Sequence, residues 1–546
     1  MKNSRSVFSR AASLFVAASL SLALVSNSAL AKSKPSKITT SDAARFLTQS
    51  SFGPTSALIS QVQRSGFTNF LNQQFSTSST LTVPRVDAAI AALPAGTDPS
   101  NPLFQEAWWY TVVNAPDQLR QRVAFALSEI MVISANGNSM YQHPESMATY
   151  WDVLTQDAFG NFRQLLEDVT LNPAMGDYLD MVHNDKPNPR RNTEPNENYA
   201  REIMQLFTIG LYKLNQDGSQ QLDINGQPIP TYDQDVVEGN AHVFTGWYWY
   251  QTGTPTWGYV QPNYRQPMMA FAEHHDTGAK TILNGVTLPA GQTQAQDLKN
   301  CLDTIFNHSN VGPFVARRLI QRLVTSNPSP TYIARIAKVF ANNGHSVRGD
   351  MKAVVQAILL DSEARSSSFV SSDDYGHERE AVIRLANLYR AFNASSSTGK
   401  VVVNSSTFNF GQAPLYAPSV FNFFSPFYSQ AGPIQDADLV APEFQITTDT
   451  TVITSANRMR SAVYQQPSSG NPDAIVLDLS AQMALASNPT SLVDSLNTLL
   501  MSGQMSSNMR SIVINAVSQI PAANTLERAQ TAVHLIVTSP EFVIEK

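Results

Sequence analysis

The sequence predicts a mainly α-helical protein, built as one large domain over residues 41–546. Apolar residues recur at helical spacing through most of the chain, and breakers such as Phe52-Gly53-Pro54-Thr55 separate one such segment from the next. Strand patterning is confined to a small β-hairpin insertion at 212–232. Two long segments near 248–290 and 395–435 are rich in aromatic residues or proline, so we expect irregular loops there.

The first 31 residues have the three parts of a secretory signal peptide. Lys2, Arg5 and Arg10 give a positive start, Ala11 to Val25 is apolar, and Ala29-Leu30-Ala31 is a small-x-small cleavage site. Residues 32–40 follow as a basic and polar leader. We therefore expect an exported protein, periplasmic or extracellular. Since no later run reaches about 20 apolar residues, we expect no transmembrane segment after cleavage.

The composition of the chain argues against several classes of function. The net charge is −6, and it becomes −9 once the three basic residues of the signal are removed, which argues against nucleic-acid binding. Cys301 is the only cysteine, so a disulfide within the chain and cysteine-rich metal sites are excluded. Histidine and carboxylate side chains remain as ligands or acid/base groups.

Helices are expected in the following order. Before the β insertion they cover Ser41 to the breaker at Phe52, Thr55 to Arg64, Thr68 to Phe75, Gln105 to Val113, Asp117 to Ser134, Glu145 to Ala158, Asn161 to Thr170 and Asn196 to Ile209. After it they cover 235–244, 295–308, 312–325, 329–343, 348–363, 376–394, 441–464, 490–503, 506–518 and 524–539. Residues 76–100 are predicted to be surface loop in part, because serine, proline and alanine dominate them.

The helix at 196–209 concentrates charge in an otherwise apolar segment. Asn196 is a favourable N-cap, and Gly210 stands where a C-cap glycine would end the helix. Glu197 and Arg201 are four residues apart, in the order that favours an ion pair. Glu202 falls at the margin of the apolar face. It is therefore either half of a buried salt bridge or a site carboxylate.

The β insertion is predicted from two turn dipeptides, Asp217-Gly218 and Asn225-Gly226. The twelve-residue spacing of an EF-hand is absent, so turn chemistry explains these acidic residues better than calcium does.

Asp235, Glu238 and His242 fall within a narrow arc of one helix, where they could hold one divalent metal ion. The alternative is a capping box with Asp235 as the N-cap and Glu238 three residues later. Downstream, His275 and Asp276 could form an acid/base pair or ligate a metal, with Lys280 nearby for substrate. The alternative is a polar loop.

Seven arginines stand out in an acidic, apolar chain: Arg45, Arg120, Arg122, Arg201, Arg317, Arg318 and Arg322. Several are expected to pair with Glu129, Glu202 or Glu363, and such buried pairs fix geometry. Alternatively, some bind an anionic substrate, and Arg45 and Arg122 are our candidates. Trp247 could stack on a sugar ring, although core packing is the commoner role of such residues.

Several motifs together resemble a known family, the DUF1800 proteins, a bacterial group of unknown function. They are Ala44-Arg45-Phe46-Leu47, Phe52-Gly53-Pro54-Thr55, Leu119 to Ser128, Ala158-Phe159-Gly160-Asn161, Pro173-Ala174-Met175-Gly176, Asn196 to Glu202, Phe244-Thr245-Gly246-Trp247, His275-Asp276, Asn310 to Phe314 and Ser539-Pro540-Glu541-Phe542. Members of the family often carry arginine where His242 stands here, which weakens the metal hypothesis.

The resemblance implies an exported, mainly helical protein, often encoded beside a second exported family, DUF1501, that looks like sulfatases and phosphatases. It implies no established activity. There is also no G-x-S-x-G, H-E-x-x-H, P-loop or G-x-G-x-x-G motif in the sequence.

Two functions remain as hypotheses. The first is a hydrolase acting on a polysaccharide or similar envelope polymer, with Glu197, Arg201, Glu202, His275 and Asp276 as its catalytic residues. The second is a non-catalytic export or assembly partner of a DUF1501-like protein. The enzyme needs its charged residues to meet at a solvent-reached pocket, whereas the partner protein would bury them as satisfied pairs.

Overall fold

Helices carry most of the ordered backbone in the computed structural model, which describes residues 37–404, 406–468 and 470–546. The mainly α fold is confirmed, and residues 38–546 form one unit. Strands in the described part of the chain form only three two-stranded antiparallel sheets. The predicted signal peptide at 1–31 and most of the leader at 32–40 lie outside the described residues.

The first nine helices precede the segment predicted to carry the site. They are α1 (Thr40–Ser50), α2 (Ser56–Ser65), α3 (Phe67–Ser76), α4 (Val83–Ala91), α5 (Pro102–Asn114), α6 (Gln118–Ser128), α7 (Pro144–Asp157), α8 (Phe162–Leu171) and α9 (Pro173–Tyr178), with a short 3-10 helix η1 (Ser139–Gln142) before α7. Helix α4 lies inside the segment predicted to be partly loop. A proline stands at the first or second position of α4, α5, α7 and α9, as the first helical turn favours.

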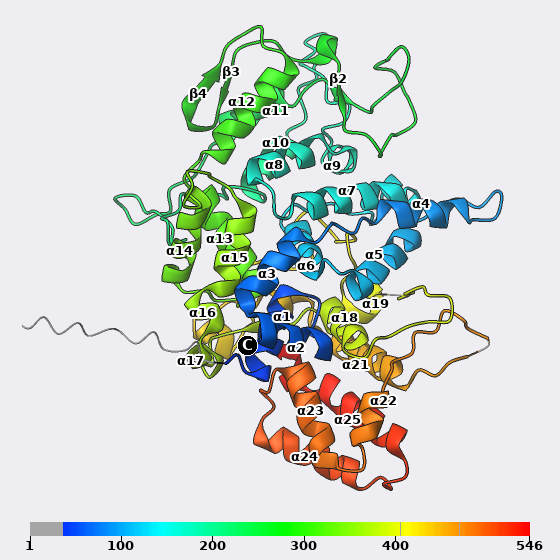
Figure 1. Ribbon diagram of the computed structural model, residues 1–546. Coiled ribbons are helices and arrows are strands. Elements are labelled where there is room, and N and C mark those ends of the chain that lie inside the picture. The colour runs from blue at the N-terminus through cyan, green and yellow to red at the C-terminus, as the bar shows by residue number, and fades with distance from the viewer. Residues whose placement is uncertain (1–36, 405, 469) are drawn as a thin grey trace, which may run out of the picture. The chain divides into compact units, whose positions relative to one another are not determined.

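Helix α6 is central. All of its residues except Arg120 are buried, and it contacts α1, α3, α5, α7 and α13 (Val311–Leu323) (Figure 1). Beside it the Trp108 ring meets the Trp109 and Trp151 rings edge-on at 5.1 and 5.8 Å. Helix α6 is shorter than predicted. It ends at Ser128, so that Glu129 is its C-cap.

Helices α10 (Asn198–Gln205), α11 (Gln234–Val243) and α12 (Gln294–Phe306) lie in the upper part of Figure 1 together with two small sheets, and α11 contacts both of the other helices. Strand β1 (Trp247–Tyr248) pairs with β2 (Met269–Ala270), and β3 (Lys280–Ile282) pairs with β4 (Val286–Leu288). Two short 3-10 helices, η2 (Ala272–His274) and η3 (Leu283–Gly285), lie between these strands.

Helix α11 lies close against its neighbours. A Cβ atom on Gly239 would stand 1.9 Å from the backbone oxygen of Thr281, so only glycine lets α11 approach β3 this closely. On the α12 side, the buried Cys301 thiol donates a hydrogen bond to Asn240 Oδ1 at 3.2 Å, and burial raises the pKa of this thiol. The N-cap of α11 is Asp233, which accepts from Val236 N at 3.1 Å. The predicted cap at Asp235 was therefore wrong.

The segment at 212–232 pairs with itself by isolated antiparallel bridges, Tyr212 with Pro230, Leu214 with Gln220 and Leu222 with Pro228. Its two turns close where Asp-Gly and Asn-Gly were expected, since Gly218 N donates to Asn215 O and Gly226 N to Asp223 O, both at 3.0 Å. Each of these pairings is a single bridge, so none of them forms a β-strand.

The next group of elements differs from the prediction at the start of one helix. It comprises α13, α14 (Pro330–Ala341), α15 (Met351–Leu360), α16 (Ser362–Arg365), α17 (Ser367–Val370), β5 (His377–Glu378) and α18 (Ala381–Ala391). The helix predicted at 376–394 begins only at Ala381, because His377 and Glu378 pair as a strand with β6 (Ile544–Glu545) at the end of the chain.

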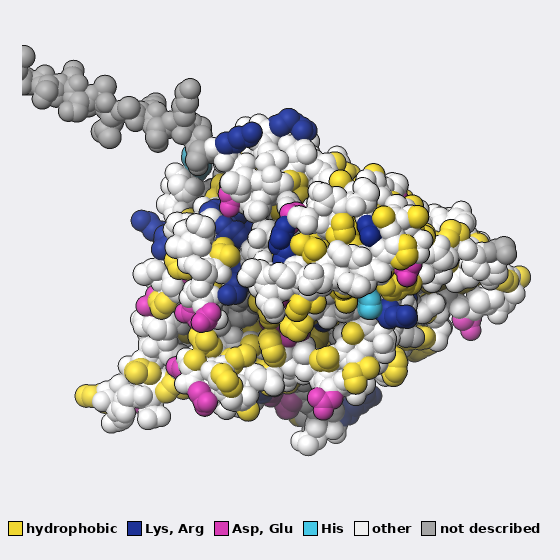
Figure 2. Space-filling model, turned by 90° about the horizontal axis from the view of Figure 1, so that it is seen from below, with side chains coloured by type: hydrophobic (Ala, Val, Ile, Leu, Met, Phe, Trp, Pro, Cys, Tyr) yellow, Lys and Arg dark blue, Asp and Glu magenta, His cyan; other side chains and the backbone are white. Residues whose placement is uncertain are grey.

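The remaining elements are α19 (Ser406–Phe410), α20 (Pro433–Asp436), the 3-10 helix η4 (Pro442–Ile446), α21 (Asp449–Tyr464), α22 (Ser480–Leu485), α23 (Pro489–Met501), α24 (Ser507–Ser518), α25 (Thr525–Val537) and α26 (Pro540–Val543). Helix α23 contacts both α1 and α18, so the two ends of the domain are packed together. Figure 2 looks at the end where α23 to α25 lie, and Lys and Arg side chains gather at the top and left of that view. Among the helices of the described residues, none has the length and apolar character needed to cross a membrane.

Candidate functional site

The ion pair predicted on α10 is present. Arg201 Nη2 lies 2.8 Å from Glu197 Oε2, and both side chains are partly exposed. Gln234 of α11 donates to Glu197 at 3.0 Å and to Glu238 at 3.2 Å. A hydrogen-bonded strip on the surface therefore joins α10 to α11.

Glu202 has no salt bridge within the described residues. Its Oε2 is buried and lacks a hydrogen-bond partner there. Burial raises the pKa of Glu202, and the nearby Arg201 charge opposes that shift. The expected salt bridge to a distant arginine was wrong.

His275 and Asp276 face opposite ways. His275 is buried, with Nε2 3.0 Å from Asp297 Oδ2 of α12 and Nδ1 3.1 Å from the Thr245 backbone oxygen. Lys280 Nζ lies 2.8 Å from the same Asp297 oxygen. Asp276 instead pairs with His242 Nδ1. The predicted His275–Asp276 pair is thus replaced by a buried His275–Asp297–Lys280 cluster.

The three predicted segments are neighbours, since α10 contacts α11 and α11 contacts β3. Their polar groups nevertheless separate into the surface strip and the buried cluster. No group of three or more His, Cys, Asp or Glu side chains in the described chain is arranged to hold a metal, so the Asp235 and Glu238 hypothesis gains no support.

Trp247 is buried in β1. Of all the predicted site residues, only Arg45 lines one of the pockets described below. The catalytic role assigned to Glu197, Arg201, Glu202, His275 and Asp276 stays a prediction.

A second set of charged side chains meets at the middle of the domain. We call it the charged centre: Glu129, Glu378, Glu380, Glu443 and Glu545, with Arg122, Arg322, Arg379 and His377. All nine are buried, and they come from α6, α13, β5, the turn before α18, η4 and β6. Burying this many charges is costly unless they are paired, so the geometry of the pairs decides what the centre can do.

Glu129 and Glu380 lie on either side of the Gln412 side chain. Burial, together with the nearby Glu380 carboxyl, raises the pKa of Glu129 well above its usual range, while the charges of Arg322 and Arg122 oppose that shift. Gln412 Nε2 donates to both, to Glu129 Oε1 at 3.3 Å and to Glu380 Oε2. Two neighbouring carboxyls do not ionise together easily, so this environment favours the protonated form of Glu129.

Arginine and histidine side chains pair with Glu129, Glu443 and Glu545. Arg322 Nε lies 3.4 Å from Glu129 Oε2, and its Nη1 lies 3.7 Å from Glu443 Oε1. Arg379 Nε and His377 Nε2 both face Glu545 Oε2, at 3.4 and 3.6 Å. The expected pairing of Glu129 with one of the seven arginines is confirmed for Arg322.

Pockets reach the charged centre from several sides. The Glu129 pocket, of about 460 Å³, has Glu129, Arg318 and Arg322 among its lining. Its remaining lining is largely apolar and includes Leu206, Ile209, Leu211, Tyr212, Phe314, Phe421, Phe424 and Phe427. The Glu380 pocket, of about 340 Å³, is lined by Glu378, Glu380, Arg384 and Glu443 among others. A third pocket, of about 710 Å³, includes Arg45, Arg379 and Glu545.

Arg318 gives the Glu129 pocket a positive charge. It forms no ion pair with a carboxylate of the described residues, and it lies against the Phe314 and Phe427 rings at 4.9 and 4.5 Å. Burial, reinforced by the charges of Arg317 and Arg322, lowers the pKa of Arg318 to about 9. The pocket therefore combines a carboxyl with a raised pKa, a guanidinium that forms no ion pair among the described residues, and aromatic walls.

A family model described as "Protein of unknown function (DUF1800)" matches residues 45–544, nearly the whole chain. The chain belongs to the DUF1800 family. No curated protein and no solved structure matches it. Every residue of the charged centre except Glu545 lies inside the range matched by the DUF1800 model.

The sequence held one signal for the charged centre of this DUF1800 protein. His377-Glu378-Arg379-Glu380 are four consecutive ionisable residues directly before the apolar helix α18, and all four are buried. The helix predicted at 376–394 would instead spread these four residues around its circumference. A run of ionisable residues directly before an apolar helix therefore indicates a buried charged centre.

The charged centre makes stability depend on pH. Burial raises the pKa of Glu443 to about 7, against the charges of His377 and Arg322, which lower it. Between its ordinary value and about pH 7 the folded protein holds a proton on Glu443 that the unfolded chain has released, so stability falls as pH rises through this window. One such group contributes at most about 1.4 kcal/mol per pH unit.

We expect Glu443→Gln to flatten the decline of unfolding free energy between about pH 5 and 7, as measured by urea denaturation at half-unit steps. Glu527→Gln, an exposed carboxylate in α25, is the control and should leave the slope unchanged. Equal slopes for wild type and Glu443→Gln would contradict the assignment.

Proposed function

We propose that this DUF1800 protein is an exported hydrolase that uses general acid/base catalysis in the Glu129 pocket. The observation that carries the proposal is the place of Glu129 in the pocket wall, where burial and the neighbouring Glu380 carboxyl raise its pKa. Carboxyls with raised pKa values are the usual proton donors of glycoside hydrolysis, so an envelope polysaccharide is the substrate class we favour. Export to the periplasm or beyond is part of the proposal, because it rests on the sequence of residues 1–31.

Each group has a part in this mechanism. Glu129 gives its proton to the oxygen of the leaving group as the bond to that oxygen breaks. The resulting Glu129 carboxylate is held by Arg322, 3.4 Å away, and by the Gln412 amide. It then takes a proton from the water that attacks the other fragment, which restores the starting state. Glu380 lines the neighbouring pocket and keeps the proton on Glu129 between turnovers.

The test is the release of new reducing ends from purified envelope polysaccharide. General acid/base groups contribute at least about 100-fold to rate, so Glu129→Gln should release product about 100-fold more slowly while keeping its melting temperature within a few degrees. Glu273→Gln is the control, because Glu273 is exposed on η2. Glu202→Gln tests the site predicted from the sequence. A loss confined to Glu202→Gln, or no release by the wild type, would refute the proposal.

A second candidate function rests on a separate observation. Leu211, Tyr212, Phe421 and Phe427, all in the lining of the Glu129 pocket, are 40 to 59 % exposed. Exposed apolar groups around a groove are typical of surfaces that bind another protein. The alternative is therefore a non-catalytic partner of a DUF1501-like exported protein. Phe421→Ser would then abolish co-purification with that protein without any effect on polysaccharide.

A further inference from the structure

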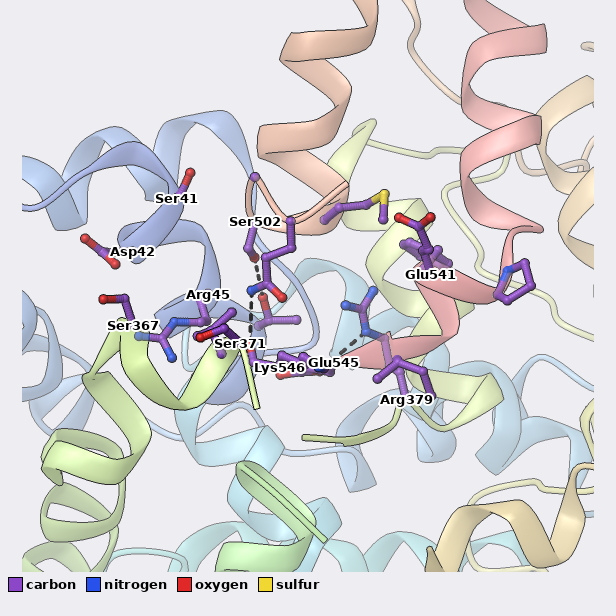
Figure 3. A pocket seen from close by; sticks show the side chains of 18 residues that line it. Ser41, Asp42, Arg45, Ser367, Ser371, Arg379, Ser502, Glu541, Glu545 and Lys546 are labelled. Carbon is purple, nitrogen blue, oxygen red and sulfur yellow. Dashed lines mark hydrogen bonds and ion pairs between the residues drawn. The ribbon is translucent and has the colours of Figure 1, made fainter. Parts of the chain in front are cut away.

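The pocket of about 710 Å³, which we call the Arg45 pocket, lies apart from the Glu129 and Glu380 carboxyls. It is bounded by α1, α17, the turn after α23 and the last residues of the chain. Figure 3 shows Arg45 with Ser41 and Asp42 on one side and Arg379 with Glu541 on the other, while Ser371, Ser502 and Lys546 lie between them. Basic groups thus enter it from opposite walls.

Arg45 forms no salt bridge within the described residues, and the charge of Asp42 only partly offsets the burial that lowers the pKa of Arg45. Its side chain is 4 % exposed, its Nη2 donates to the backbone oxygen of Arg365, and its Nη1 has no hydrogen-bond partner among the described residues. Arg365 lies behind it against the Phe46 and Phe67 rings, and none of its three guanidinium nitrogens has a partner within the same part of the chain. Burial, with the added charge of Arg45, lowers the pKa of Arg365 to about 9.

Arg379 on the other wall is only partly satisfied. It is also 4 % exposed, and its Nη1 lacks a hydrogen-bond partner among the described residues. Its single carboxylate contact, Glu545, is shared with His377. An unsatisfied buried N–H group costs stability, so two such groups at one pocket need a reason.

The other carboxylates of the pocket are already engaged. Asp42 accepts from the Thr39 hydroxyl at 2.7 Å, and Glu541 accepts from Ser506 N and Oγ at 2.8 and 2.6 Å. Neither carboxylate forms a salt bridge with Arg45 or Arg379 in the part of the chain that the structure describes, so both arginines keep N–H groups without a partner there.

We propose that the Arg45 pocket binds the phosphate group of a phosphorylated ligand. Guanidinium groups present paired N–H donors that match the oxygens of a phosphate. Positive charges on two walls of the pocket suit a ligand with two negative charges better than they suit a carboxylate, which carries one. The cavity is far larger than phosphate itself, and Val370, Met501 and Phe542 give it apolar walls for the organic part. This binding site is separate from the hydrolase chemistry proposed for the Glu129 pocket.

Calorimetric titration with glycerol 3-phosphate tests the proposal, with glycerol as the phosphate-free control. We expect binding of the ester only. Ser371 is exposed in the pocket wall, so Ser371→Glu adds a negative charge there at little cost to folding. It should weaken binding at least tenfold, whereas the neutral and equally large Ser371→Gln should not. Arg45→Gln should weaken binding to a similar extent, and Arg190→Gln, a change at an exposed arginine, should leave it unchanged.

Vesicles distinguish the two sources of such a phosphate. Sedimentation with vesicles that contain phosphatidic acid, whose headgroup is a phosphate monoester, would assign the site to a lipid headgroup if it is lost in Ser371→Glu. Binding of the soluble ester alone would assign the site to a small molecule. No binding of either probe, or binding that neither Ser371→Glu nor Arg45→Gln weakens, would overturn the proposal. If Arg45→Gln fails to fold, the two Ser371 variants still decide the outcome.

Discussion

Replacing Asp297 by alanine should lower the free energy of unfolding by about 3–5 kcal/mol, since that is the usual cost of leaving a buried charge without its partner. Asp297 has no exposed surface, and the same carboxylate oxygen contacts His275 and Lys280 at 3.0 and 2.8 Å. Without it, the Lys280 ammonium keeps only the backbone oxygens of Asp276 and Gly278. Urea denaturation at pH 7 measures the loss.

Asp303→Ala provides the matched control. Asp303 is also on α12 and also contacts two cations, Arg163 and Lys299, but its side chain is 37 % exposed. Exposed pairs are worth about 0–1 kcal/mol, so this change should cost far less. A double change, Asp297→Leu with Lys280→Met, should recover part of the stability lost in Asp297→Ala, because it removes the charge as well as its partner. Equal losses for Asp297→Ala and Asp303→Ala would show that the cluster is not a buried ion pair.

Gly239→Ala should destabilise the protein by about 3 kcal/mol, the upper end for overpacking, because the new methyl group would meet backbone. Alanine is intrinsically the better helix former by about 1 kcal/mol, so any loss identifies the clash with Thr281 rather than a change of propensity. Thermal and urea unfolding measure the effect.

Gly258→Ala is the control for Gly239→Ala. Its nearest contact to a new Cβ would be the Thr256 hydroxyl at 3.4 Å, in an exposed loop, so we expect a change below about 0.5 kcal/mol. If Gly239→Ala is neutral, α11 and β3 can separate without cost, and the packing that joins the predicted segments is loose.

The fold could be predicted largely from the local rules of helix formation. Capping residues and breakers placed α2, α3, α8 and α12 to within a few residues, and Thr293 with Gln296 forms a full capping box at the start of α12. The rules failed where tertiary contacts override propensity. The pairing of His377 and Glu378 with Ile544 and Glu545 joins residues more than 160 positions apart, and no window of sequence contains both.

The candidate site was harder to predict for the same reason. Glu197 and Arg201 are four residues apart, so helical geometry alone predicts their contact. Glu129, Arg322, Glu380 and Glu443 come from four distant segments, and their pairing follows only from how α6, α13 and α18 pack. His275 illustrates the opposite error. The adjacent Asp276 looked like its partner, but neighbouring side chains point to different sides, and the buried Asp297 contacts the imidazole instead.

The hydrogen bond from Cys301 to Asn240 gives the chain a property useful to experiment. The only sulfhydryl in the sequence is enclosed between α11 and α12, and its raised pKa keeps it un-ionised at neutral pH. Maleimide reagents, which react with thiolate, should therefore leave the native fold unlabelled. A cysteine introduced at a surface position would be the sole attachment point for a fluorophore or spin label, with no need to remove Cys301 first.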